Sequence, residues 1–319
     1  MNSPVDNRNQ LGRTDVHVSS LGIGGGSLSN AIGDGGFREV VDEAWKQGLR
    51  YFDTAPLYAN GLSEQRFGEA LATRSRTEFV LSSKTGRWNS DGGNRFDYSY
   101  EGTMRSVEKS LTRLRMDYID VVCIHDVIPA LHGEAFESRF GEAMSGAYRA
   151  LEELKQQKVV RAIGAALREP DVCERFAREG NFDCFMLAGG HTLLQHGAMS
   201  SFLPLCVERH ISVIVASPFN TGILATGVVG GARYEYRPAE ETPGIVERVR
   251  QLEEIGRTHD VPLAVAALQF PLRCSAVVSV VAGHQSAEEL LQNLKCMETI
   301  IPDGYWRDLK TAGLIPVAA

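Results

Sequence analysis

Four polar side chains in the first half of the chain fall at or just after the ends of predicted β-strands. Asp53 ends one such strand, and Tyr58 follows five residues later. Lys84 and His125 stand at the ends of the next two strands. A tyrosine hydroxyl has an ordinary pKa near 10, which is too high for easy proton exchange at neutral pH. A lysine ammonium beside the phenol would lower that pKa, and the carboxylate of Asp53 would balance the buried ammonium.

Together these groups predict one kind of chemistry. His125 would hydrogen-bond a substrate oxygen and hold it towards Tyr58, which would act as the general acid or base. Such an arrangement suits the reduction of a carbonyl or the oxidation of an alcohol. Because no side chain donates a hydride ion, the chemistry implies a nicotinamide cofactor.

The elements that must position these residues alternate between short apolar runs and amphipathic stretches. Strands are predicted at 21–24, 49–53, 78–83, 118–125, 159–164, 182–187, 211–217 and 276–282. Helices are predicted at 36–47, 63–73, 100–114, 142–157, 171–179, 198–209, 243–260 with 262–273, and 286–298. Continuous apolar strands are typical of a parallel sheet buried on both faces. Eight strand–helix units predict the α/β class and a closed (β/α)8 TIM barrel.

The remaining segments fit one barrel domain that spans residues 1–319. A short hairpin within 10–20 would close the bottom of the barrel. Long loops follow the third strand (85–99) and the fourth strand (126–141). In a barrel of this kind the loops after the strands build the active site, so these two are expected to shape the pocket. No linker-like change of composition divides the chain.

Composition excludes several classes of protein. The 319 residues include 33 basic and 40 acidic side chains, giving a net charge of −7 without a basic run, so no nucleic-acid partner is expected. No stretch of eighteen apolar residues and no secretory signal are visible, so no membrane partner is expected. The six cysteines form no CxxC pair. We therefore expect reduced thiols, no metal site and a cytoplasmic location, and the sequence leaves the oligomeric state open.

Several stretches resemble the aldo-keto reductase superfamily. They are GLRYFDTAPLYANGLSEQRFGEAL (48–71), LSSKTGR (81–87), YIDVVCIHD (118–126) and VASPFNTGIL (215–224), and the similarity runs from LGIGGG (21–26) to VVAGHQSAEELLQNL (280–294). The D-T-A-x-x-Y-x-x-G-x-S-E run from Asp53 to Glu64 is highly specific. The resemblance implies a catalytic tetrad of Asp53, Tyr58, Lys84 and His125. Within the superfamily, the chain is similar to the aldose and pyridoxal dehydrogenases.

The resemblance also implies an extended nicotinamide dinucleotide bound without a Rossmann fold. Its phosphates would lie by the loop after the seventh strand and at the start of the helix after the eighth, where a helix N-terminus favours an anion. The implied contacts are Ser217, Phe219, Gly222 and Leu224, followed by Gly283, Gln285, Glu289 and Asn293.

Three departures from the family pattern concern this cofactor. Gln285 and Glu289 stand where relatives that prefer NADP often carry basic side chains, and a carboxylate would accept from a ribose hydroxyl but repel a 2′-phosphate. We therefore expect NAD rather than NADP. Ala165 and Ala166 replace the Ser-Asn pair that holds the carboxamide in many relatives, and Ala216 replaces a stacking tyrosine.

Four other hypotheses compete with this interpretation. The glycines of 21–27 suggest a Rossmann fingerprint, but Ser27 replaces the third glycine. An aldolase with Lys84 as a Schiff base would leave Asp53 and Tyr58 unexplained. A metallohydrolase would need clustered ligands, and no HxH pair is present. A redox-sensing subunit would bind the cofactor tightly but turn over poorly.

For the substrate we expect a small polar aldose such as L-fucose, L-galactose or D-arabinose, oxidised at C1 to the lactone. Pyridoxal, oxidised through its cyclic hemiacetal, is the alternative. Trp88, in the loop after the third strand, is expected to form a wall of the substrate pocket.

Overall fold

The computed structural model describes residues 8–319 except 32, 91–92, 230–232, 236 and 240–241. Its centre is a closed barrel of eight parallel strands in the order β10-β11-β14-β3-β4-β5-β8-β9. The barrel strands are β3 (Leu21–Gly24), β4 (Tyr51–Asp53), β5 (Val80–Thr85), β8 (Ile119–His125), β9 (Val160–Leu167), β10 (Cys184–Ala188), β11 (Ser212–Ala216) and β14 (Val277–Gly283). Each predicted strand is confirmed, and so is the TIM barrel. The closed sheet rules out the Rossmann alternative for the glycine-rich stretch.

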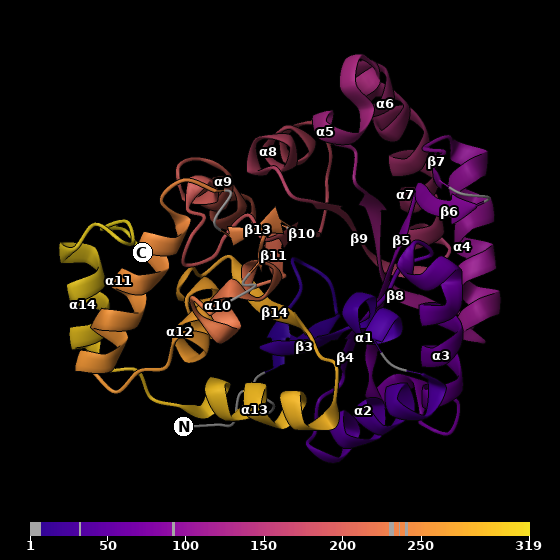
Figure 1. Cartoon of the computed structure of the whole chain (residues 1–319). Coiled ribbons are helices and arrows are strands. Elements are labelled where there is room, and N and C mark those ends of the chain that lie inside the picture. Colours follow the sequence, from indigo (N-terminus) through magenta and orange to yellow (C-terminus); the bar gives the residue numbers. More distant parts are fainter. Residues whose placement is uncertain (1–7, 32, 91–92, 230–232, 236, 240–241) are drawn as a thin grey trace.

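Helices surround the barrel (Figure 1), with α2, α3 and α4 on one side and α11, α12 and α14 on the other. They are α1 (Gly25–Ala31), α2 (Asp34–Lys46), α3 (Leu62–Leu71), α4 (Tyr100–Leu114), α5 (Pro129–His132), α6 (Phe136–Glu142), α7 (Arg149–Gln156), α8 (Pro170–Glu179), α9 (Phe202–Arg209), α10 (Ile223–Thr226), α11 (Ile245–Thr258), α12 (Leu263–Gln269), α13 (Ala287–Glu298) and α14 (Asp303–Thr311). A π-helical turn, Ala143–Tyr148, leads into α7. The predicted helices are all present, with ends that differ by a few residues.

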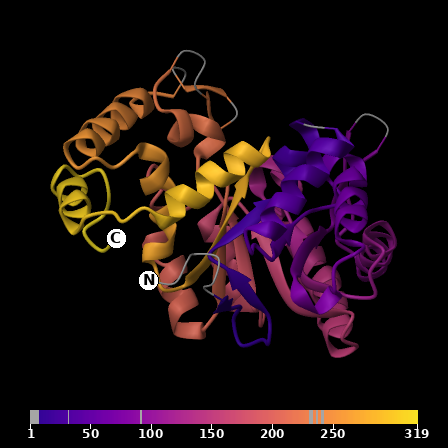
Figure 2. The ribbon, with the colours of Figure 1, turned by 90° about the horizontal axis from the view of Figure 1, so that it is seen from below.

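An antiparallel hairpin closes the amino end of the barrel, as predicted. It pairs β1 (Arg8–Gln10) with β2 (His17–Ser19), and Figure 2 shows it in indigo below the barrel. Leu11, Val16 and Val18 are fully buried and pack with the apolar side chains of the barrel interior. The hairpin therefore fills the bottom of the barrel and leaves the carboxyl ends of the strands for chemistry.

The two long loops contain short elements that the sequence did not reveal. The loop after β5 forms an antiparallel hairpin of β6 (Arg87–Ser90) and β7 (Gly93–Phe96). The loop after β8 forms α5 and α6. A third small hairpin, β12 (Arg233–Tyr234) with β13 (Arg237–Pro238), lies in the segment between α10 and α11.

A buried glutamate links the elements beneath the predicted site. Glu64 of α3 is fully buried and accepts hydrogen bonds from Ser83 Oγ at 2.7 Å and Arg113 Nε at 2.6 Å. It therefore ties α3 to β5 and α4. This carboxylate belongs to the Asp53–Glu64 motif, but its role is to hold the frame of the barrel.

Candidate active site

A buried ion pair joins the ends of β4 and β5. Lys84 Nζ donates to both carboxylate oxygens of Asp53 and to the carbonyl oxygen of Thr54, each at 2.8 Å. Ser82 Oγ donates to Asp53 at 2.6 Å. Both charged side chains are almost fully buried. Because an ammonium has three hydrogens, these three acceptors match its donors and fix its position.

Tyr58 lies above this pair at the start of a 3-10 turn, Tyr58–Gly61. Lys84 Nζ is 4.8 Å from the centroid of the Tyr58 ring. Three residues in the left-handed region follow, Ala59, Asn60 and Gly61, and they turn the chain sharply behind the phenol. A Cβ on Gly26 would come within 3.5 Å of the ring, so the glycine-rich stretch after β3 packs closely against Tyr58.

Opposing effects set the pKa of Tyr58. Removal from water raises the pKa of its hydroxyl to about 12, and the nearby charge of Asp53 adds to that rise. The ammonium of Lys84 lowers the pKa, as expected, but burial outweighs it. The predicted effect of Lys84 is therefore present, but it does not bring the pKa of Tyr58 below its ordinary value.

His125 ends β8 and faces Tyr58 edge-on, with 6.2 Å between the ring centroids. Burial lowers the pKa of the imidazole to about 4; Asp126 opposes this shift, and Lys84 and Arg87 add to it. The ring is thus neutral at physiological pH. Its Nε2 lies 3.4 Å from Asp126 Oδ2. This contact favours the tautomer with the proton on Nε2, and a substrate oxygen would have to share that proton with Asp126.

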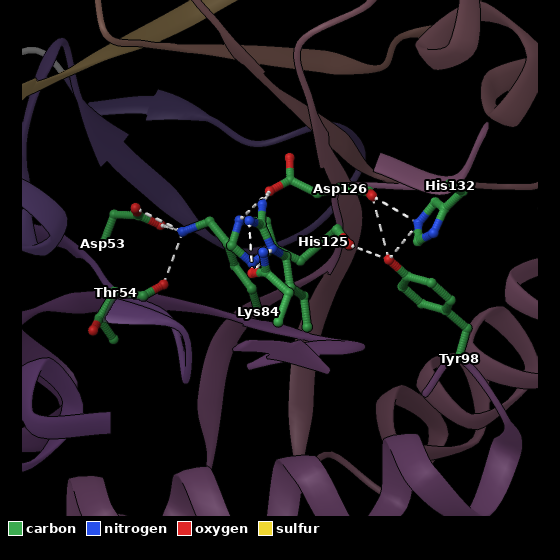
Figure 3. Close-up of polar contacts among 9 residues, drawn as sticks. Asp53, Thr54, Lys84, Tyr98, His125, Asp126 and His132 are labelled. Carbon is green, nitrogen blue, oxygen red and sulfur yellow. Dashed lines mark hydrogen bonds and ion pairs between the residues drawn. The ribbon is translucent and has the colours of Figure 1, made fainter. Parts of the chain in front are cut away.

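Asp126 is the centre of a network that the sequence did not single out (Figure 3). Its carboxylate accepts a short hydrogen bond from Arg87 Nη1. Its carbonyl oxygen accepts from the Tyr98 hydroxyl at 3.3 Å and lies 3.2 Å from His132 Nε2. The Tyr98 hydroxyl also donates to the carbonyl of His125 at 2.9 Å. The only local signals for this network were the acid beside His125 and the arginine of KTGR.

Three of the four predicted catalytic residues, Tyr58, Lys84 and His125, meet at one cavity of about 510 Å³ at the carboxyl ends of the strands, and Asp53 is bonded to Lys84 behind it. Tyr58, Lys84, His125, Arg87, Asp126 and Arg168 line it together with aliphatic side chains that include Leu57, Ile128 and Leu131. A second cavity of about 380 Å³ shares Ile128, Ala130, Arg168, Ala188 and Ser217 with the first and continues towards Asn220 and Thr221. The two form one continuous cleft.

Trp88 is placed elsewhere. It lies on β6 and lines a separate cavity with Pro56, Asn60 and Arg113, on the α4 side of the hairpin. It is not among the residues that line the cavity of Tyr58 and His125. Arg87, one position earlier on the same strand, faces that cavity instead, because neighbouring strand residues point to opposite sides.

The residues expected to hold the dinucleotide lie at the ends of neighbouring strands. β11 and β14 pair directly, so Ser217, which follows β11, and Gly283, which ends β14, lie at neighbouring strand ends. Ser217 lines both cavities. Gly222 begins α10 with φ +116° and open space where a side chain would be. Phe219 packs against the apolar core, and the side chain of Leu224 is fully buried, so Leu224 offers only its backbone.

The helix after β14 begins as its sequence predicts. Ser286 Oγ accepts from the backbone N–H of Glu289 at 3.2 Å, and Glu289 Oε2 accepts from the N–H of Gln285 at 2.8 Å. Gln285 and Glu289 are exposed, whereas Asn293 is buried one turn further along. The first turn of α13 therefore carries two acidic side chains, Glu288 and Glu289, and no basic one.

The cleft fits a flat nicotinamide ring. Ala188 and Ala216 pair at the ends of β10 and β11, Ala166 lies one residue before the end of β9, and all three line the cavity beside Tyr58. Three small side chains from neighbouring strands leave room for a planar group against the floor of the cavity. No group of acidic, histidine and cysteine side chains in the described ranges is arranged to hold a metal ion. Within the same ranges, no helix is long and apolar enough to cross a membrane.

Comparison with known proteins agrees with this geometry. The model of the aldo/keto reductase family matches residues 20–312. The chain belongs to the aldo/keto reductase family. It is 36% identical to D-threo-aldose 1-dehydrogenase of a Pseudomonas species, over 94% of this chain and 95% of that protein. It is 33% identical to pyridoxal 4-dehydrogenase of Microbacterium luteolum, over 99% of this chain and the whole of that protein.

The fold is also that of a solved family member. The holo form of an aldo-keto reductase from Bacillus halodurans matches with a TM-score of 0.82 and 28% identity, over 98% of this chain and 97% of that one. The family assignment makes this reductase an NAD(P)-dependent oxidoreductase, as the resemblance implied. The aldolase and metallohydrolase alternatives are thereby set aside.

Proposed function

We propose that this enzyme oxidises a small polyhydroxylated aldose at C1 to the lactone, using NAD. The observation that carries the proposal is the meeting of Tyr58, Lys84 and His125 at one cavity, with Asp53 bonded to Lys84 behind it. Charged side chains of Arg87, Asp126 and Arg168 line that cavity, which suits a substrate rich in hydroxyl groups. The similarity to D-threo-aldose 1-dehydrogenase supports the same substrate class.

In the proposed reaction His125 donates from Nε2 to the reacting oxygen and holds it beside Tyr58. The phenolate form of Tyr58 accepts the proton of the C1 hydroxyl while the C1 hydrogen leaves as hydride. The oxygen lone pair forms the carbonyl bond of the lactone, and the proton passes from Tyr58 to solvent. The bound nicotinamide supplies the hydride acceptor.

For the cofactor, the proposed contacts are the backbone of Ser217–Leu224 at the phosphates and the three alanines beneath the nicotinamide. The carboxamide would bond to Ser217 or Arg168, because both line the cavity and Ala166 offers no donor. Asn293 and the N-terminus of α13 would lie by the adenosine. We propose NAD over NADP because the first turn of that helix is acidic and Glu289 bonds back to the loop before it, through the N–H of Gln285.

Pyridoxal is the second candidate substrate, favoured by the 33% identity to pyridoxal 4-dehydrogenase. Its flat aromatic ring would use the aliphatic wall of Leu57, Ile128 and Leu131. A sensor that binds cofactor without turnover would leave the complete tetrad without a use. The free state of all six cysteines supports a reducing compartment, and we propose the cytoplasm.

One assay tests the function directly. Purified protein is mixed with NAD or NADP and L-fucose, L-galactose, D-arabinose, pyridoxal or simple alcohols, and reduced nicotinamide is followed by absorbance. We expect NAD-linked turnover of at least one aldose. Tight cofactor binding without turnover of any compound would contradict the proposal and favour the sensor.

The catalytic assignment has its own test. Tyr58→Phe keeps the ring but removes the group that carries the proton, so kcat should fall about a thousandfold. Cofactor affinity, measured by quenching of intrinsic fluorescence, should stay within about twofold, since the hydroxyl is not proposed to touch the phosphates. Near-normal kcat in this variant would reject Tyr58 as the general base.

A further inference from the structure

We propose that Asp126 makes this reductase select substrates with a hydroxyl group on the carbon next to the reacting carbon. The proposal rests on the function proposed above and deepens it, because it names the feature of the substrate that is recognised. It assigns Asp126 the role of a substrate-binding residue beside the tetrad.

The position of the Asp126 carboxylate carries the proposal. Asp126 Oδ2 lies 3.4 Å from His125 Nε2, the atom that would hold the reacting oxygen. The carboxylate lines the same cavity as Tyr58. Oxygens on neighbouring carbons of a sugar lie about one hydrogen-bond length apart. A substrate whose C1 oxygen is held by His125 would thus bring its C2 oxygen to the Asp126 carboxylate.

One oxygen of Asp126 remains available for such a contact. Oδ2 accepts from Arg87 and faces His125, whereas Oδ1 has no hydrogen bond to any residue in the described part of the chain. Figure 3 shows this oxygen pointing away from the ion pair. A carboxylate oxygen has two lone pairs, so Oδ1 can accept a hydroxyl hydrogen without disturbing Arg87.

The charge of Asp126 makes the contact selective. Burial opposes ionisation of this carboxyl, but the charges of His125 and Arg87 hold its pKa below the ordinary value. At neutral pH His125 is uncharged, and the ion pair with Arg87 keeps the carboxylate ionised. An ionised carboxylate accepts hydrogen bonds and donates none. It would bind a hydroxyl group, leave a methylene group without a partner and repel an anionic oxygen such as a phenolate.

Asp126 is also held in a fixed position, as a group must be to distinguish substrates with the neighbouring hydroxyl from those without it. Its φ of +54° is unusual for a residue other than glycine, and its carbonyl oxygen is fixed by the contacts with Tyr98 and His132. Arg87, which binds the carboxylate, is itself held by Asn94 Oδ1 at 2.9 Å from Nη2. A group placed by both backbone and side-chain contacts loses little freedom when substrate binds.

A purely structural role for Asp126 makes a different prediction. If the Arg87 ion pair only fastened the β6–β7 hairpin to β8, loss of the carboxylate would slow all substrates by the same factor. A recognition role changes the ratio between substrates that do and do not carry the neighbouring hydroxyl. The ratio therefore separates the two roles.

The test compares kcat/KM for D-arabinose and 2-deoxy-D-ribose, which differ only at C2, in the wild type, Asp126→Ala and Asp126→Asn. We expect the wild type to prefer the hydroxylated sugar about a hundredfold, as for a hydrogen bond to a charged group. Asp126→Ala should reduce the preference to less than about fivefold, and Asp126→Asn should lie between. Asp117→Asn, an exposed aspartate just before the same strand, is the matched control and should keep the wild-type ratio.

The outcomes are distinct. Efficient turnover of both sugars by the wild type would overturn the inference and leave the proposed function standing, without need of any variant. An unchanged ratio in a folded Asp126→Ala, with cofactor binding intact, would overturn it as well. If no aldose is oxidised at all while pyridoxal is, the proposed substrate class fails and this inference fails with it.

Discussion

The surroundings of Tyr58 shift the pKa of its hydroxyl in opposite directions. Burial holds its hydroxyl in the protonated form with a pKa of about 12, while Lys84 pulls in the other direction. The ammonium itself is kept charged by Asp53, because its three donors all meet acceptors and the pKa of Lys84 is raised although burial alone would lower it. The ion pair therefore limits the rise in the pKa of Tyr58.

This balance predicts the pH dependence of the oxidation. The base is the phenolate, whose fraction grows about tenfold per pH unit below the pKa. With that pKa near 12 and His125 neutral above about pH 4, kcat/KM for oxidation should climb steadily from about pH 5 to pH 9 without a plateau. Rate measurements across that range would contradict the assignment if they showed a bell with a midpoint near the ordinary pKa of histidine.

Lys84→Met gives the companion experiment. Removing the ammonium raises the pKa of Tyr58 further, so oxidation should be slower at every pH while the profile keeps its slope. The variant also leaves Asp53 buried without its partner, so its fold must be checked by circular dichroism before rates are compared.

At the scale of the elements, Asp120 joins three barrel strands far below the site. This fully buried carboxylate of β8 accepts from the N–H of Leu81 at 2.9 Å in β5. It also accepts from Arg76 and from Arg161 of β9, each at 2.6 Å. A charge buried in this way is balanced only while its partners stay in place.

Asp120→Asn should therefore destabilise the protein. We expect the free energy of unfolding to fall by about 2 kcal/mol, since both arginine partners retain some exposure to solvent. Urea denaturation measures this directly, with the exposed Asp117→Asn as the control that should change little. An unchanged midpoint for Asp120→Asn would mean that the three strands are held without this carboxylate.

The N-terminus of α13 makes a prediction about cofactor choice. Glu289→Ala removes the only acidic side chain there that bonds back to the loop, through the N–H of Gln285. If its charge discriminates against a 2′-phosphate, the ratio of kcat/KM for NAD over NADP should drop about tenfold. Glu288→Ala, which removes a neighbouring charge in the same turn, should have a smaller effect. Equal ratios in wild type and Glu289→Ala would reject this role.

The sequence predicted the repeated strands of the barrel, but it did not predict contacts between segments that are far apart in the chain. Continuous apolar runs predicted all eight barrel strands, because both faces of those strands are buried. The ion pair of Arg87 with Asp126 joins residues 39 apart, and no local pattern marks such a pair. The β6–β7 hairpin is largely exposed and polar, so it left no apolar signature, and Trp88 fell on its far side.

At the scale of the molecule, the barrel interior is one column of apolar side chains. It runs from Leu11, Val16 and Val18 of the hairpin up to Ala166 and Met186, which also line the catalytic cavity. We propose that the chain unfolds as one unit, since this column and the outer helices share the same strands. Denaturation followed by circular dichroism and by tryptophan fluorescence should then give the same midpoint.

Leu11→Ala tests how much the hairpin contributes. The side chain is fully buried at the bottom of the column, so its truncation should lower the free energy of unfolding by about 3 kcal/mol. KM should not change, because the site lies at the other end of the barrel. Leu291→Ala, at a leucine that is 42% exposed, is the control with little expected loss. A raised KM in Leu11→Ala would show that the two ends of the barrel are coupled.

The closed lower end of the barrel also offers a place to attach a fusion partner or a solid support. Arg8 begins the hairpin there, and Ala319 lies beside Arg273 and Cys274, just before β14 enters the barrel from the same end. A fusion partner or a solid support joined through either of these points would sit behind the molecule and leave the mouth of the cleft open. Immobilised in this orientation, the reductase should accept its substrates as freely as it does in solution.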